Sequence, residues 1–221
     1  MEGQGTAEGE ALAAEARRDL AALARVDTPS VRALRRLYSR ALANAPAAEV
    51  LRFVRSLLPG AGWPERLVAC EVLASHAGAL ERVNDRVVEE MARGLADWGS
   101  VDLVGVTVVG QAWREGRVTD AKILAWARSP DRWRRRLALV ATVPLNSRAR
   151  GGTGDARRTL RVCRALLGDA DDIVVKAMSW ALRELAKRDP AAVKAFLARE
   201  DARLPARVSR EVSSKLRTGR K

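Results

Sequence analysis

The sequence predicts an all-helical protein, and three observations support this fold class. The 221 residues are rich in Ala, Leu, Arg and Glu and poor in Ile, Thr, Tyr and Phe, a bias that favours helix over strand. Apolar residues recur at helical spacing along the chain and do not alternate as they would in a strand. Similar helix starts also recur at intervals of 31 to 40 residues.

Helical periodicity, proline positions and glycine breaks together define the expected elements. The expected helices are roughly 9–25, 29–44, 47–58, 63–77, 81–95, 98–114, 119–128, 131–144, 154–167, 171–187, 190–199 and 205–217. Pro29, Pro64 and Pro130 lie near first turns, where the missing N–H of proline is tolerated. Asp189-Pro190 ends one helix and begins the next.

An internal repeat organises these helices. The repeating units are Trp63-x-x-Arg66, Trp98-x-x-Val101, Trp133-x-x-Arg136, Ile173-x-x-Lys176 and Leu204-x-x-Arg207. Their first members are 35, 35, 40 and 31 residues apart, a period typical of helix pairs in an α-solenoid. We therefore predict one domain over residues 9–218, an α-solenoid of HEAT-like helix pairs with a curved, basic concave surface. Residues 1–8 are expected to be a disordered lead-in.

The fourth residue of the unit is usually basic. Arg66, Arg136, Lys176 and Arg207 would form a row along one edge of the concave face, where they could meet the phosphates of a duplex. The unit at Trp98 breaks the series, with Val101 in the basic position and Asp102 next to it. Trp98 and Asp102 are four residues apart and would share a helix face. Because Asp102 is a single acid beside this row of basic residues, we take it as the candidate catalytic residue.

The net charge of +13 lies in one part of the chain. Residues 1–127 hold 16 Lys/Arg and 17 Asp/Glu, whereas residues 128–221 hold 24 and 10, a net charge of +14. Such asymmetry attracts a polyanion and favours nucleic-acid binding. The alternative is a solvated surface encoded by an arginine-rich, high-GC genome.

Several function classes are disfavoured. One histidine, His76, argues against a zinc site or a histidine-based triad and is expected to be structural. Cys70 and Cys163 lie far apart in apolar patterns and are expected to be reduced, buried thiols. No apolar run approaches the ~20 residues of a membrane span, and the N-terminus lacks secretory-signal features. We expect a cytoplasmic, nucleoid-associated protein with no metal or cofactor.

Three ordered motifs resemble the AlkD-like family of bacterial DNA alkylation-repair glycosylases, which are built from HEAT-like repeats. The first is Trp98-x-x-x-Asp102, and the second is Ser129-Pro-Asp-Arg-Trp133-Arg-Arg-Arg136. The third comprises Lys176, Ala177, Trp180, Leu182, Arg183, Glu184 and Lys187. Thr28, Pro29 and Arg32 precede these motifs, and Asp189-Pro190 and Leu204-x-x-Arg207 follow them, so the resemblance spans about residues 26–217.

The resemblance implies a role for each motif. Asp102 would be the catalytic carboxylate, and Trp98 and Trp180 would hold the damaged nucleotide. The implied DNA-binding residues are Arg136, Arg183, Lys187, Lys176 and Arg207. The implied protein is a monomeric, monofunctional glycosylase that excises N3- or N7-alkylated purines from double-stranded DNA without base flipping.

Two departures from the family leave alternatives open. The stretch that usually carries an N-terminal tyrosine has none here, since the only tyrosine is Tyr38, and Trp98 is followed by Gly99 where many relatives have Asp. A non-catalytic protein that binds damaged or distorted DNA is the second hypothesis, and a protein-binding scaffold is the third. Asp102 could be an ordinary paired surface acid, Trp98 and Trp180 core fillers, and Arg136 a general basic-face residue. The preferred lesion and a self-resistance role also stay open.

The other tryptophans are expected to pack inside the protein. Trp63, Trp113 and Trp126 are expected in the core. Trp133 is expected to pack and thereby orient Arg136.

Overall fold

A computed structural model describes residues 8–219, which form helices and turns with no β-strand among them. This confirms the all-α prediction. The expected lead-in lies outside the described residues, apart from Glu8, which begins the first helix. The chain divides into two compact units, of which the first ends at Val108 and the second begins at Val109.

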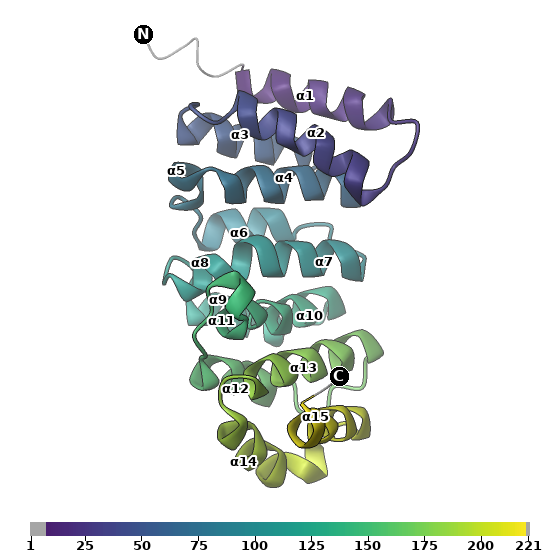
Figure 1. Cartoon of the computed structure of the whole chain (residues 1–221), viewed down its shortest axis with the longest axis vertical. Helices are drawn as coiled ribbons and strands as arrows, with labels where there is room; N and C mark the ends of the chain where they lie inside the picture. The colour runs from purple at the N-terminus through teal and green to yellow at the C-terminus, as the bar shows by residue number, and fades with distance from the viewer. Residues whose placement is uncertain (1–7, 220–221) are drawn as a thin grey trace. The chain divides into compact units, whose positions relative to one another are not determined.

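The first unit is built from two layers of helices. Its helices are α1 (Glu8–Ala21), α2 (Thr28–Ala41), α3 (Ala47–Leu57), α4 (Trp63–Ser75), α5 (Ala77–Leu80), α6 (Asp85–Ala92) and α7 (Trp98–Val104) (Figure 1). Helix α1 packs on α3 in one layer, while α2 packs on α4 and α4 on α7 in the other. Phe53, Leu73 and Met91 are fully buried between the layers. Each pair thus buries its apolar side against its neighbours.

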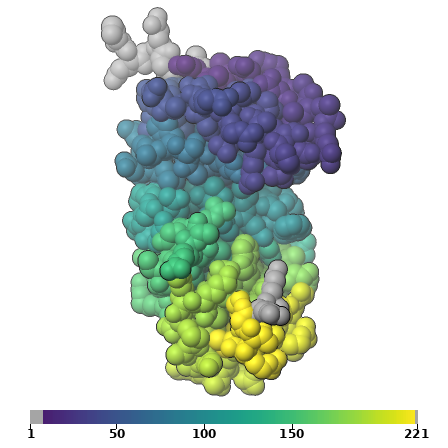
Figure 2. Space-filling model, viewed as in Figure 1, coloured from purple at the N-terminus to yellow at the C-terminus, as the bar shows by residue number. Residues whose placement is uncertain are grey.

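The second unit repeats this two-layer arrangement. Its helices are α8 (Gly110–Arg114), α9 (Asp120–Ala127), α10 (Arg132–Val140), α11 (Val143–Asn146), α12 (Ala156–Ala165), α13 (Asp172–Ala186), α14 (Pro190–Glu200) and α15 (Ala206–Thr218). Helices α10, α13 and α15 contact one another in order, and α9, α12 and α14 form the other layer. In Figure 2 the yellow α15 lies against the yellow-green surface of the neighbouring helices.

The repeat places its helices in equivalent layers of the two units. Trp63 and Trp98 are the first residues of α4 and α7, and Trp133 and Ile173 are the second residues of α10 and α13. Leu204 is different, because it precedes α15 by two residues and closes a short 3-10 turn. The predicted unit is therefore a helix start in four cases and a pre-helical turn in the fifth.

Three predicted helices differ in detail from the structure. The expected helix 81–95 is shorter, as α6. The expected helix 131–144 is divided between α10 and α11. The expected helix 98–114 contains a π-helical turn, Gly105–Val109, between α7 and α8. Val106, Thr107, Val108 and Val109 are β-branched, and such residues crowd the preceding turn of an α-helix. This run of β-branched residues is the feature of the sequence from which the irregular turn could have been predicted.

Most of the residues expected to be structural are buried or capping residues, and Trp63 is the exception. Cys70 and Cys163 are buried free thiols, and burial raises the pKa of each to about 12. The ring of His76 caps α5, since its Nδ1 accepts the Ala79 N–H at 3.0 Å. Trp113 and Trp126 are buried, whereas Trp63 is only half-buried.

Two features are absent from residues 8–219. No helix there is both long enough and apolar enough to pass through a bilayer. No group of three or more His, Cys, Asp or Glu side chains is placed to hold a metal ion.

Candidate nucleic-acid interface and active site

Helix α7 begins with a cap that fixes the position of Trp98. The Asp97 carboxylate accepts the Ser100 N–H at 2.8 Å and so satisfies a donor that the helix leaves unpaired. Trp98 is the first helical residue, and 66 % of its surface is exposed. An indole so exposed has no role in core packing, so the core-filler alternative is wrong for Trp98.

Asp102 lies one helical turn after Trp98. The other side of α7 is buried through Ser100, Val101 and Val104, and the helix packs on α4. Asp102 itself is half-buried. The burial pattern therefore leaves the indole and the carboxylate on the accessible side of one helix, as the four-residue spacing predicts.

Helix α13 carries the second group of predicted residues. They are the α13 residues Lys176, Trp180 and Arg183 and the C-cap residue Lys187. Their spacings of four, three and four residues place them on a single stripe. The opposite side of the helix is buried through Ala177, Ala181 and Leu185, among others. The stripe is accessible to varying degrees, with Lys176 exposed and Trp180 half-buried.

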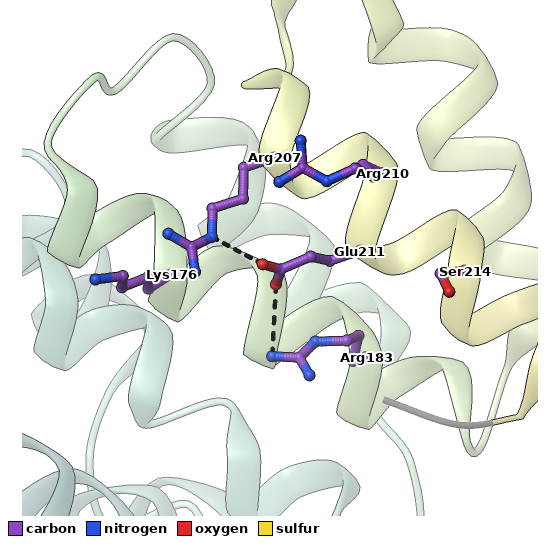
Figure 3. Close-up of a pocket in the computed structure, with 6 residues that line it drawn as sticks. All are labelled: Lys176, Arg183, Arg207, Arg210, Glu211 and Ser214. Atoms are coloured by element: carbon purple, nitrogen blue, oxygen red, sulfur yellow. Dashed lines mark hydrogen bonds and ion pairs between the residues drawn. The ribbon is translucent and has the colours of Figure 1, made fainter.

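Helix α15 forms the other wall of two hollows beside this stripe. The hollow shown in Figure 3 has a volume of about 500 Å³ and is lined by Lys176, Arg183, Arg207, Arg210, Glu211 and Ser214. A second, of about 530 Å³, is lined by Lys176, Trp180, Arg183, Glu184, Lys187 and Lys215. Lys176 and Arg183 border both. Arg210 and Lys215 are new to the site, because sequence spacing alone does not reveal which face of α15 meets α13.

Two carboxylates hold part of this cluster in place. Glu211 accepts the Arg207 Nε–H at 2.8 Å and lies 3.8 Å from an Arg183 nitrogen (Figure 3). It also accepts the Ser179 hydroxyl at 2.6 Å. Burial works to raise the pKa of Glu211, but these donors outweigh it and lower the pKa below the usual 4.5. Asp172 pairs with Lys176 at 2.6 Å and with Arg207 at 3.1 Å.

The predicted row of basic residues is wrong for Arg66 and fits Arg136 poorly. Arg66 is 3 % exposed and donates to the carbonyls of Met91 and Arg93 at 3.2 and 3.0 Å. Arg136 is 7 % exposed and donates to the Ile173 carbonyl at 2.6 Å. A guanidinium has several donors and can satisfy main-chain carbonyls of a neighbouring helix pair. Both arginines therefore join successive helix pairs.

Other arginines of the basic half are also used inside the protein. Arg135 binds the Asp169 carboxylate at 2.7 Å. Arg188 donates to the carbonyls of Asn146 and Gly152 at 2.8 and 2.9 Å. Arg158 donates to the Trp113 carbonyl at 3.0 Å. Part of the positive excess therefore ties helices together, and another part lines the α13–α15 hollows.

The predicted residues form two sets. Trp98 and Asp102 lie on α7 of the first unit. In the second unit, Trp180 and four predicted DNA-binding residues line the α13–α15 hollows, namely Lys176, Arg183, Lys187 and Arg207. Arg136 does not line either hollow.

Comparison with known proteins identifies the family of the chain. A solved structure described as a predicted DNA alkylation repair enzyme from Enterococcus faecalis has the same fold, with a TM-score of 0.68 and 19 % sequence identity, over 99 % of this chain and 98 % of that one. No curated protein matches the sequence. The family model described as DNA alkylation repair enzyme matches residues 18–216. This match spans most of the sequence, and the chain therefore belongs to the DNA alkylation repair enzyme family.

Proposed function

We propose that this protein is a monofunctional DNA glycosylase that removes N3- or N7-alkylated purines from double-stranded DNA. Membership of the alkylation repair family supports a role in that repair. The observation that carries the specific activity is the exposed Trp98 one helical turn from Asp102 on α7. A half-buried carboxylate one helical turn from an exposed indole suits a cationic nucleotide.

The chemistry requires only stabilisation of charge and one water molecule. Alkylation at a ring nitrogen makes the purine cationic and a good leaving group. When the C1′–N9 bond breaks, its electron pair neutralises the base and positive charge develops on the sugar. The Asp102 carboxylate stabilises that charge and accepts a proton from the water that adds to C1′. The products are a neutral alkylated base and an abasic site.

The other residues of the proposal bind and orient the DNA. The indole face of Trp98 attracts the cationic nucleotide, and the Trp180 indole offers a second such face in the second unit, at about 0.5–2 kcal/mol for each indole. Lys176, Arg183, Lys187 and Arg207 bind backbone phosphates along the α13–α15 hollows. We assign Arg136 a supporting role, because its guanidinium is committed to the Ile173 carbonyl. We further propose that the base is not flipped into a pocket, which would allow bulky adducts as substrates.

The first test is excision from a duplex that carries a single 7-methylguanine. Wild-type protein should produce abasic sites, and Asp102→Asn should reduce the single-turnover rate by about 100-fold or more, because the amide has no charge. Glu81→Gln is a matched control, since Glu81 is an exposed carboxylate at the end of α5 and should be dispensable. Equal rates for wild type and Asp102→Asn would exclude Asp102 as the catalytic group.

A second candidate function is binding of damaged DNA without catalysis. The observation in its favour is that Tyr38 is 4 % exposed and donates its hydroxyl to Asp19 at 2.6 Å, so the only tyrosine is committed inside the first unit. It does not replace the tyrosine that the AlkD-like pattern carries. This function predicts salt-dependent binding to the same duplex with no abasic product.

A further inference from the structure

The α15 wall of the two hollows carries cations that no sequence motif singled out. Arg210 lines the hollow that contains Glu211, and Lys215 lines the one that contains Trp180. Among residues 8–219, the Arg210 guanidinium makes no ion pair or hydrogen bond, although Lys176, Arg183 and Arg207 around it all do. Arg210 therefore has no anionic partner among the described residues, and its guanidinium is available to bind an anionic group of a ligand.

Each hollow has an excess of positive charge. The first is lined by four cations, Lys176, Arg183, Arg207 and Arg210, and by the carboxylate of Glu211, and even with Asp172, which pairs with Lys176 and Arg207, the cations are in excess. The second contains Lys176, Arg183, Lys187 and Lys215 against Glu184. Their volumes of about 500 and 530 Å³ fall within the roughly 300–1,000 Å³ of small-ligand sites, so each could take a phosphate with part of its sugar.

The two hollows are joined by the residues that border both. Lys176 and Arg183 line each hollow, so an anion in either is within the field of the same two cations. Only the second hollow has an aromatic wall, from Trp180. A polyanion with regularly spaced charges and flat rings fits such a pair of sites, and a single DNA strand has both properties.

We propose that the two α13–α15 hollows together form a two-phosphate site. In this site one DNA strand passes from Trp180 to α15. One phosphate binds in the hollow of Arg207 and Arg210, and its neighbour binds in the hollow of Lys187 and Lys215 beside Trp180. Glu211 positions the Arg207 and Arg183 side chains through the contacts already described. The proposal deepens the proposed function and rests on it for the identity of the ligand.

The first experiment measures binding of a short duplex carrying one 7-methylguanine over a range of salt concentrations. Arg210→Gln should weaken binding by about three- to tenfold and lower the slope of log K against log salt by about 0.9, the value for one phosphate. Lys194→Gln is the matched control, because Lys194 is an exposed cation on α14 that lines neither hollow. Identical slopes for the two variants would overturn the proposal.

The second experiment identifies the phosphates. Single phosphates of the damaged strand are replaced one at a time by uncharged methylphosphonates. One replacement should weaken binding of wild type but not weaken Arg210→Gln further, and the replacement at an adjacent phosphate should show the same coupling with Lys215→Gln. Coupling to no phosphate, or to phosphates that are not adjacent, would overturn the two-phosphate site.

Excision measured on the same samples separates this inference from the proposed function. If wild type excises the base while Arg210→Gln binds like Lys194→Gln, the two-phosphate site is wrong and the glycosylase proposal is unaffected. If Arg210→Gln lowers the salt slope but wild type makes no abasic site, the two-phosphate site is supported and the glycosylase activity is wrong.

Discussion

Arginine has two different uses in this chain, and single residues show the contrast. Arg66 and Arg136 are buried and donate hydrogen bonds to main-chain carbonyls. Arg210 is exposed and has no hydrogen-bond or ion-pair partner among the described residues. Arg136 and Arg210 both lie in basic helices, α10 and α15, and yet differ in this respect. An arginine can therefore contact DNA only when the surrounding helices do not already use its N–H donors.

Ser179 gives a test at the residue scale. Its hydroxyl is fully buried next to Trp180 and donates to the Glu211 carboxylate at 2.6 Å. Ser179→Ala should lower the free energy of unfolding by about 1.5–3 kcal/mol, because a hydrogen bond to a charged group is lost. Urea denaturation measures the change. Ser213→Ala, at an exposed position of the same helix as Glu211, should stay within about 0.5 kcal/mol of wild type. Similar values for both would contradict the role given to Ser179.

At the scale of elements, helix pairs depend on close approaches as well as on apolar stripes. Gly110 in α8 faces the carbonyl of Ala141 and the ring of Pro144, where α11 begins. A Cβ at this position would lie 2.5 Å from the Ala141 oxygen and 2.6 Å from the Pro144 Cγ, well inside van der Waals contact. The absence of a side chain is therefore what allows α8 and α11 to pack.

Gly110→Ala is therefore expected to destabilise the second unit. The cost should be about 1–3 kcal/mol, the usual range for overpacking, despite the better helix propensity of alanine. Gly78→Ala is the matched control, since its Cβ would meet only ordinary contacts of 3.7 Å or more and it should be neutral or stabilising. Thermal unfolding of both variants measures the difference, and a neutral Gly110→Ala would show that the two helices can move apart freely.

At the scale of the whole molecule, both units use carboxylates shared between basic partners. In the first unit, Glu90 accepts from Arg55 at 2.7 Å and from Arg86 at 3.2 Å. In the second unit, Glu211 accepts from Ser179 and Arg207. Burial tends to raise the pKa of each glutamate, but the donors prevail and lower the pKa of both below the usual 4.5. Both groups therefore bind protons less readily in the folded protein than in the unfolded chain.

The sign of these pKa shifts predicts acid sensitivity. The stabilisation is fully present above about pH 4.5, where the unfolded carboxyls are ionised, and it is lost as the pH falls through the lower folded values. The free energy of unfolding should change little between neutral pH and about pH 5, and then fall by about 1–2 kcal/mol because of these two groups. Urea denaturation at each pH measures it. The variant that combines Glu90→Gln and Glu211→Gln should show a weaker acid dependence, and an unchanged one would contradict the assignment.

The amino-acid pattern alone determined the helices and much of the candidate site. Apolar periodicity, capping residues and prolines are local signals, so most predicted helices match the structure to within a few residues. The same local geometry placed Trp98 with Asp102, and Lys176 with Trp180, Arg183 and Lys187, because residues three or four apart share a helix face. The motifs that resemble the repair family also led to the family that the comparison shows.

Only the tertiary structure decided which charges remain available to a ligand. Whether an arginine meets a carbonyl or solvent depends on the helix packed against it, and that helix can be about 25 to 40 residues away, as for Arg66 and Arg136. The same dependence explains why Arg210 and Lys215 could not be recognised beforehand, since the packing of α15 on α13 creates the hollows that they line. Local spacing determines which residues share a face, and long-range packing determines what that face meets.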